Sequence, residues 1–185
     1  LRTGELLRGR PDLYITRRAP VAYNPGIRNV RWEQFIDFAT GGQYFYHCHR
    51  ENKISDEHGH FHCYIRTKFI PKYIKPLNLP PIENINHNNK MTHLIAIGMN
   101  RLGQPIRLFT VNRWVTSEQW YSARYASNLT KRFKMNLSDE SSWRVVDKWL
   151  EGILHLFLPQ IVWLQKQRDI KIASYKKDLE FKKIF

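Results

Sequence analysis

Two short segments near the middle of the chain alternate histidine or aromatic side chains with other residues. They are residues 43–50 (QYFYHCHR) and 59–67 (GHFHCYIRT). Alternation of this kind is typical of β-strands, because successive side chains point to opposite faces of a sheet. The polar stretch between the two segments, residues 51–58, is short enough to be a hairpin loop. The sequence therefore predicts an antiparallel hairpin, and with it a fold built around an antiparallel sheet.

The alternation also predicts which histidines share a face. His47 and His49 lie on one face of the first strand, and His60 and His62 lie on one face of the second. His58 is expected at the mouth of the second strand. If residue 49 pairs with residue 60, and residue 47 with residue 62, the four imidazoles form a compact square on one face of the hairpin.

The opposite face of the predicted hairpin is apolar, and we expect it to pack on helices. Both cysteines of the chain, Cys48 and Cys63, fall on this face and are expected to be core thiols. Because the strand register is inferred, a disulfide between them stays open.

The remaining pattern predicts two more strands, at residues 93–100 and 105–116, and then helices. Ser117 is a suitable cap for a helix through residue 125. Apolar residues then recur at helical spacing from residue 138, and Pro159 separates this tract from a second helix.

The predicted fold class is therefore α+β: an antiparallel sheet of four or more strands, which can be strongly curved, with C-terminal helices packed on one face. We expect an irregular N-terminal arm (1–40) and a histidine-rich sheet domain with a helix (41–137). The C-terminal helices (138–185) would belong to the same domain.

The net charge of the chain indicates which classes of partner it favours. The net charge is +14 at pH 7 and the sequence pI is about 10. This favours nucleic acid or a small anionic substrate, although the charge is spread along the chain, and solubility accounts for it equally well.

Cysteine content and hydropathy bear on the compartment. Two cysteines indicate no disulfide framework, so we expect a reducing, cytoplasmic location. No apolar run is long enough for a transmembrane segment. Because the chain begins at Leu1 and not at Met, we also expect an N-terminal piece ahead of it.

Clustered neutral imidazoles are the ligands that transition metals prefer. The sequence therefore predicts a divalent transition metal, Zn, Fe or Mn, and Glu57 is a candidate catalytic base. A metal-bound water would then hydrolyse a small anionic substrate. A metal-free polar pocket, and an oxygenase or isomerase with a histidine-rich iron site, stay open as alternatives. The expected metal ligands are His47, His49, His58, His60 and His62.

Residues His60-Phe61-His62 resemble the HUH motif of rolling-circle replication and relaxase endonucleases. In that family, two histidines help to hold a divalent metal, and a tyrosine on a later helix attacks the scissile phosphate. The resemblance implies Tyr121 or Tyr125 as the nucleophile here, since both lie on one face of the predicted helix. A non-enzymatic module that binds metal or nucleic acid is a further alternative.

Several blocks between residues 40 and 121 resemble successive blocks of an uncharacterised bacterial family, a domain of unknown function. The blocks include GHFH at 59–62, HLIAI at 93–97 and LFTVNRWVT at 108–116. The resemblance carries no activity, but it implies that these blocks form one site. That site would contain Asn112, Trp114 and His93 as substrate-binding residues, and Arg113 as a catalytic clamp on a phosphate or carboxylate.

Overall fold

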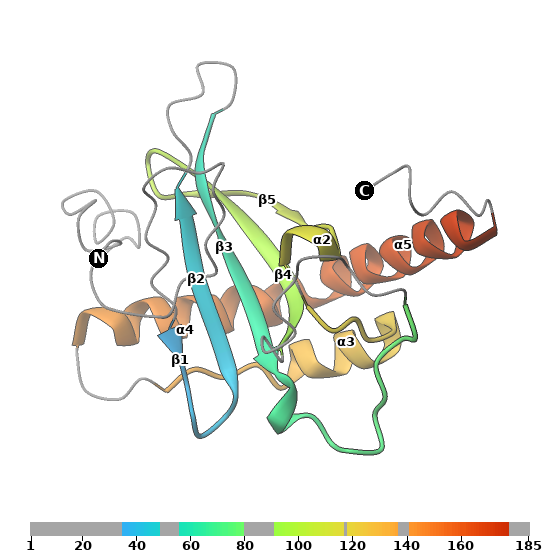
Figure 1. Cartoon of the computed structure of the whole chain (residues 1–185). Coiled ribbons are helices and arrows are strands. Elements are labelled where there is room, and N and C mark those ends of the chain that lie inside the picture. Colours follow the sequence, from blue (N-terminus) through green and yellow to red (C-terminus); the bar gives the residue numbers. More distant parts are fainter. Residues whose placement is uncertain (1–34, 49–55, 80–90, 117, 137–140, 178–185) are drawn as a thin grey trace, which may run out of the picture.

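The computed structural model describes residues 35–48, 56–79, 91–116, 118–136 and 141–177. Within these ranges the strands form one five-stranded antiparallel sheet in the order β1-β2-β3-β4-β5 (Figure 1). The strands are β1 (Phe35–Ile36), β2 (Gly42–Cys48), β3 (Glu57–Arg66), β4 (Met91–Asn100) and β5 (Pro105–Phe109). The helices are the 3₁₀ turn η2 (Thr67–Phe69), α2 (Arg113–Thr116), α3 (Ala123–Lys131), α4 (Ser141–Leu156) and α5 (Leu158–Lys177).

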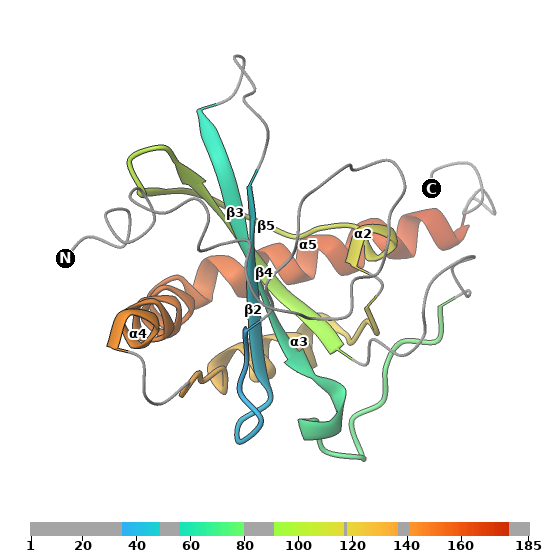
Figure 2. The same ribbon diagram turned by 60° about the vertical axis from the view of Figure 1, so that its left-hand side comes forward.

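The predicted fold class is confirmed. The sheet is antiparallel and open, and α4 and α5 run one after the other across its strands (Figures 1 and 2). The predicted domain boundaries stay a prediction, and residues 1–34 of the expected arm lie outside the described residues.

The core lies between the sheet and the helices. Alternate residues of the central strands, among them Phe61, Cys63 and Ile97, are fully or almost fully buried. They pack in one cluster with apolar residues of α3, α4 and α5, such as Leu129, Leu150 and Ile161. The apolar face predicted for the hairpin is thus the face that packs on helices. The residues between these buried ones point to the other face of the sheet.

The last two helices meet close to Pro159. Helix α4 ends at Leu156, and α5 begins at Leu158, which places the proline in the first turn of α5. Proline is tolerated there because the first N–H groups of a helix have no partner within the helix. Phe157, between the helices, donates to the carbonyl of Ile153 and accepts from Ile161, so backbone hydrogen bonding continues through the junction.

Two sequence predictions about element boundaries are wrong. The strand predicted over 105–116 ends at Phe109, and its last four residues form α2. The helix predicted over 117–125 starts later, at Ala123. Its start is determined by tertiary structure, because the Ala123 N–H donates to the Asp169 carboxylate of α5 at 2.6 Å.

No helix in the described part of the chain is both long enough and apolar enough to cross a bilayer.

Candidate functional site

The strand face that is turned away from the helices carries a group of histidines. In the β2–β3 ladder, His47 pairs with His60 and Phe45 pairs with His62. The expected register, with residue 47 opposite residue 62, is wrong by two residues. A shift of two keeps every side chain on its face, so the prediction that His47, His60 and His62 share one face is confirmed. His49 lies outside the described residues.

His93 of β4 joins this group. The β3–β4 register shifts between Cys63 and Tyr64, and the shift pairs Tyr64 with His93. The His62 and His93 rings are 5.3 Å apart, with His62 Nδ1 3.2 Å from His93 Nε2. We call the set His47, His60, His62 and His93 the histidine face.

The rings of the histidine face are in contact along a continuous path. His47 stacks on His60, with ring centroids 5.2 Å apart and planes 6° from parallel. His60 meets His62 edge to face at 4.5 Å. His60, His62 and His93 are 8%, 4% and 2% exposed, whereas His47 is only half-buried. The accessible end of the path is therefore at His47.

A carboxylate holds the central histidine. His60 Nδ1 lies 2.9 Å from Glu57 Oε1, and Arg107 of β5 donates from Nε to the other oxygen, Oε2. Gly98 of β4 makes this contact possible, since a Cβ there would lie 2.7 Å from both Glu57 Oε2 and Arg107 Cγ. One carboxylate oxygen of Glu57 thus has its partner on β3, and the other has its partner on β5.

These contacts determine the charge of Glu57. Burial raises the pKa of its carboxyl, but hydrogen bonds and charge from Arg107 and His60 outweigh burial, and the pKa ends below its usual value. Glu57 is therefore ionised at neutral pH and accepts the Nδ1–H of His60. This makes Glu57 the group that orients His60, which differs from the catalytic base expected from sequence.

A second buried carboxylate lies behind His93. The backbone N–H of His93 donates to Glu118 Oε2, and the Thr116 hydroxyl donates to Glu118 Oε1 at 3.0 Å. Burial raises the pKa of Glu118 to about 7 and lowers the pKa of the His93 imidazole to about 3, with the Arg168 charge adding to the latter effect. His93 is accordingly neutral at physiological pH.

Sequence reasoning missed Arg107 and Glu118. Arg107 could have been found, because β5 pairs Arg107 with Gly98, which pairs in turn with His60. Once the hairpin is recognised, this register places all three on one face. Glu118 follows the NRWVT block without any periodic pattern, and no sequence signal links it to His93.

His58 is separated from the other histidines. A register irregularity in β3 between Glu57 and Gly59 turns its side chain to the opposite face. There, His58 Nδ1 lies 3.0 Å from the Tyr46 hydroxyl, and Nε2 lies 3.4 Å from Cys48 Sγ. The expectation that His58 shares a site with His60 is wrong. It assumed regular alternation from residue 58 to residue 60, and the bulge interrupts that alternation.

The two cysteines are free thiols. Cys48 pairs with Gly59 and Cys63 with Tyr44, so the two thiols are four ladder positions apart and cannot form the disulfide that the sequence left open.

The residues of the NRWVT block do not lie on the strand that the sequence predicted for them. Asn112 is half-buried and precedes α2, which contains Trp114. Arg113 is half-buried, and burial lowers the pKa of its guanidinium while the charge of Glu118 opposes this. Their roles in substrate binding and catalysis stay predictions.

The two tyrosines of the endonuclease alternative belong to the core. Tyr121 is 3% exposed within the main apolar cluster, and Tyr125 packs against that cluster. Tyr121 precedes α3, so the two are not a helical i, i+4 pair. This placement does not support a tyrosine nucleophile beside the histidine face.

Within the ranges that the structure describes, no three histidine, cysteine, aspartate or glutamate side chains converge as a metal site. His49, an expected ligand, lies outside those ranges.

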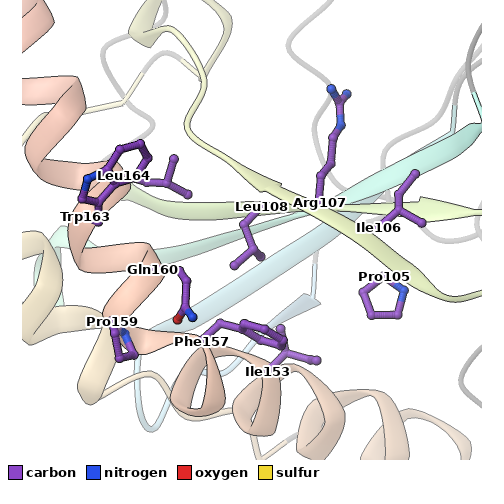
Figure 3. A pocket seen from close by; sticks show the side chains of 10 residues that line it. All are labelled: Pro105, Ile106, Arg107, Leu108, Ile153, Phe157, Pro159, Gln160, Trp163 and Leu164. Atoms are coloured by element: carbon purple, nitrogen blue, oxygen red, sulfur yellow. The ribbon is translucent and has the colours of Figure 1, made fainter.

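A pocket of about 690 Å³ lies between β5 and the junction of α4 and α5. Figure 3 shows Leu108, Ile153, Phe157 and Gln160 around it, whereas the Arg107 side chain points away. The pocket is therefore on the other side of β5 from the histidine face, and its lining is largely apolar.

Comparison with known proteins agrees with the resemblance seen in the sequence. None of the curated proteins and none of the solved structures compared with the chain matches it. A family model described as a domain of unknown function (DUF6969) matches residues 32–185, a range that includes all five strands and all the helices described above. The chain therefore belongs to the family DUF6969.

Proposed function

We propose that the histidine face is an acid–base catalytic site for hydrolysis of a small anionic substrate, with His60 as the general base. The observation that carries the proposal is the 2.9 Å contact between His60 Nδ1 and the ionised carboxylate of Glu57. An imidazole that donates Nδ1–H to a carboxylate has its lone pair on Nε2 and its ring held in one orientation. This is the arrangement that a histidine base requires.

The supporting structure makes that tautomer the favoured one. Glu57 is 7% exposed and cannot turn to solvent without leaving both Arg107 and His60. A protonated His60 would be stabilised by the same carboxylate, so the pair can take up a proton and release it. In the proposed step, Nε2 removes a proton from water as that water attacks the substrate, and His60 then returns the proton to the leaving group.

The preference for an anion rests on Arg107. Its side chain is 56% exposed, and its guanidinium lies 4.5 Å from the centroid of the Phe109 ring. The Phe109 ring in turn meets His60 edge to face at 5.1 Å. The exposed end of this guanidinium carries further N–H donors beyond Nε, which suit a carboxylate or phosphate. The net charge of +14 favours the approach of such a substrate.

A metal-dependent hydrolase is the second candidate, and one observation favours it. His62 Nδ1 and His93 Nε2 are 3.2 Å apart, which is close to the roughly 3.3 Å between two nitrogens on a tetrahedral Zn²⁺. Zn, Fe or Mn would then be the cofactor, and His47 and His60 would have to supply further nitrogens. The reducing, cytoplasmic location expected from the cysteine content is part of the proposal for either enzyme.

The tautomer can be tested without a substrate. Nitrogen-15 NMR of the imidazoles should show His60 as the Nδ1–H form, and Glu57→Gln should convert it to a mixture of tautomers. A His60 signal of the Nε2–H form in the wild-type protein would overturn the proposal.

Activity is tested on a panel of 4-nitrophenyl esters and phosphates with anionic groups. His60→Gln should abolish turnover, and His155→Gln, an exposed histidine of α4, is the matched control. Elemental analysis separates the two candidates: turnover without bound metal and insensitive to chelators supports the histidine base. Turnover that requires a metal lost in His47→Ala or His62→Ala supports the metalloenzyme, and turnover retained in His60→Gln contradicts both.

A further inference from the structure

The face of β2 and β3 that carries no part of the histidine face contains a second group of reactive side chains, at the end of β2 and the start of β3. Cys48 is half-buried there, and its Sγ lies 3.4 Å from His58 Nε2. His58 Nδ1 lies 3.0 Å from the hydroxyl of Tyr46. A thiol, an imidazole and a phenol are thus joined in one chain of contacts, in the order that a nucleophile, its base and an orienting group require.

One set of hydrogen bonds that fits these distances makes His58 the acceptor of the thiol proton. If Cys48 donates its S–H to His58 Nε2, the proton of the neutral imidazole is on Nδ1, and Nδ1–H donates to the Tyr46 oxygen. The distance from Cys48 Sγ to the His58 carbonyl is longer, 3.7 Å, so the ring nitrogen is the nearer acceptor. His58 is therefore placed to accept the proton of the thiol.

The backbone is shaped to allow this arrangement. Gly59 is the ladder partner of Cys48, and a Cβ on it would lie 2.8 Å from the Tyr46 hydroxyl oxygen and 2.3 Å from the His47 carbonyl oxygen. The irregularity between Glu57 and Gly59 turns His58 toward Tyr46 and Cys48. The absence of a side chain at Gly59 leaves room for the Tyr46 hydroxyl, and the irregularity brings His58 to the face of Tyr46 and Cys48.

A cation lies within electrostatic range of the thiol. Burial raises the pKa of Cys48 above its usual value, and the positive charge of Arg101 offsets part of that rise. Arg101 is exposed in the turn between β4 and β5. Partly exposed cysteines next to cationic groups and a base are the ones that react with electrophiles, whereas buried structural cysteines are inert.

We propose that Cys48 is a reactive thiol that undergoes exchange with small anionic disulfides, with His58 as its base and Tyr46 as a positioning residue. In the exchange, His58 Nε2 takes the proton of Cys48, and Sγ attacks one sulfur of the disulfide. The sulfur–sulfur bond of the reagent breaks as a new bond to Cys48 forms. The departing thiolate takes the proton from His58. The products are a mixed disulfide on Cys48 and one free small thiol, with no net oxidant beyond the disulfide reagent.

The chain contains its own control, because its only other cysteine, Cys63, is 0% exposed in the core. The folded protein is mixed with 5,5′-dithiobis(2-nitrobenzoate), an anionic disulfide, at one fixed neutral pH, and the released thiolate is followed by absorbance. We expect one equivalent to be released quickly and the second only after unfolding. Cys48→Ser should abolish the fast release, and Cys63→Ala should leave its rate unchanged.

The role of the base is tested by His58→Asn, which should slow the fast release by at least about tenfold, since loss of a general base typically costs about 10²- to 10⁴-fold. His155→Asn, on α4, should have no effect. Tyr46→Phe keeps the ring in place and should slow the release by a smaller factor. Arg101→Gln should slow the reaction with the anionic disulfide but not with neutral 2,2′-dithiodipyridine.

Loss of structure is distinguishable from loss of the base, because a loosened core exposes Cys63 and gives two fast equivalents. If His58→Asn gives two fast equivalents, the test rests on Tyr46→Phe. Slower release of the first equivalent by Tyr46→Phe supports the proposal, and an unchanged rate overturns it. Absence of fast release from the wild-type protein, or equal Cys48 rates in wild type, His58→Asn and Tyr46→Phe, also overturns it.

Discussion

Replacing Glu118 with Gln should change how the stability of the protein depends on pH. Glu118 is 4% exposed, and its pKa is about 7 in the folded protein against 4.5 for an unperturbed glutamate. The folded state therefore holds a proton on Glu118 at pH values where the unfolded chain has released it. For an acid whose pKa is raised by folding, stability falls as pH rises from the unfolded value through the folded one.

The size of the effect follows from these two values. Where the folded and unfolded states differ by one bound proton, each pH unit changes the free energy of unfolding by about 1.4 kcal/mol. Between pH 5 and pH 8, ionisation of Glu118 should thus remove roughly 2–3 kcal/mol of stability from the wild-type protein. A glutamine has no such ionisation, and it can still accept from the His93 N–H while its amide donates to the Thr116 hydroxyl.

Urea unfolding followed by circular dichroism at several pH values provides the measurement. The free energy of unfolding of Glu118→Gln, relative to wild type, should rise by roughly 2–3 kcal/mol from pH 5 to pH 8. The acid limb should be the same in both proteins, because the pKa of His93 falls from 6.5 to about 3 on folding. Stability from that group is present above pH 6.5 and is lost as pH falls toward 3.

Glu151→Gln is the matched control, since Glu151 lies on α4 and pairs with Lys148 at 3.0 Å. It should keep the pH dependence of the wild type. Parallel stability curves for wild type and Glu118→Gln between pH 5 and pH 8 would refute the reasoning, because Glu118 would then titrate alike in the folded and unfolded states.

Two further substitutions test the packing around the site. Gly98→Ala places a Cβ between Glu57 and Arg107 and should cost about 1–3 kcal/mol of stability in urea unfolding. The NMR signal of the Nδ1–H form of His60 should weaken as well. An unchanged signal would contradict the role of Gly98. Tyr44→Phe removes a 3.0 Å hydrogen bond to Asp147, which is 1% exposed, and should lower the free energy of unfolding by about 1–3 kcal/mol. A smaller loss than that would show that other partners of the carboxylate suffice.

The sequence by itself determined the antiparallel hairpin and the sidedness of its residues. Alternation is a local property with a period of two, so His60 and His62 lie on one face of their strand and Phe61 and Cys63 on the other. The same reasoning explains why Cys63 and Phe61 are in the core. The amphipathic tract that became α4 was recognisable for the equivalent reason, since helical periodicity is also local.

Tertiary structure alone decided which residues meet. The register between β2 and β3 depends on hydrogen bonds between strands, and the bulges that turn His58 away and bring His93 in depend on how β3 pairs with β4. The Glu57–Arg107 pair joins residues fifty positions apart, and α3 starts where Asp169 of α5 accepts its first N–H. Such contacts follow from the packing of distant segments, because a side chain's partner across a sheet leaves no periodic trace in its own sequence neighbourhood.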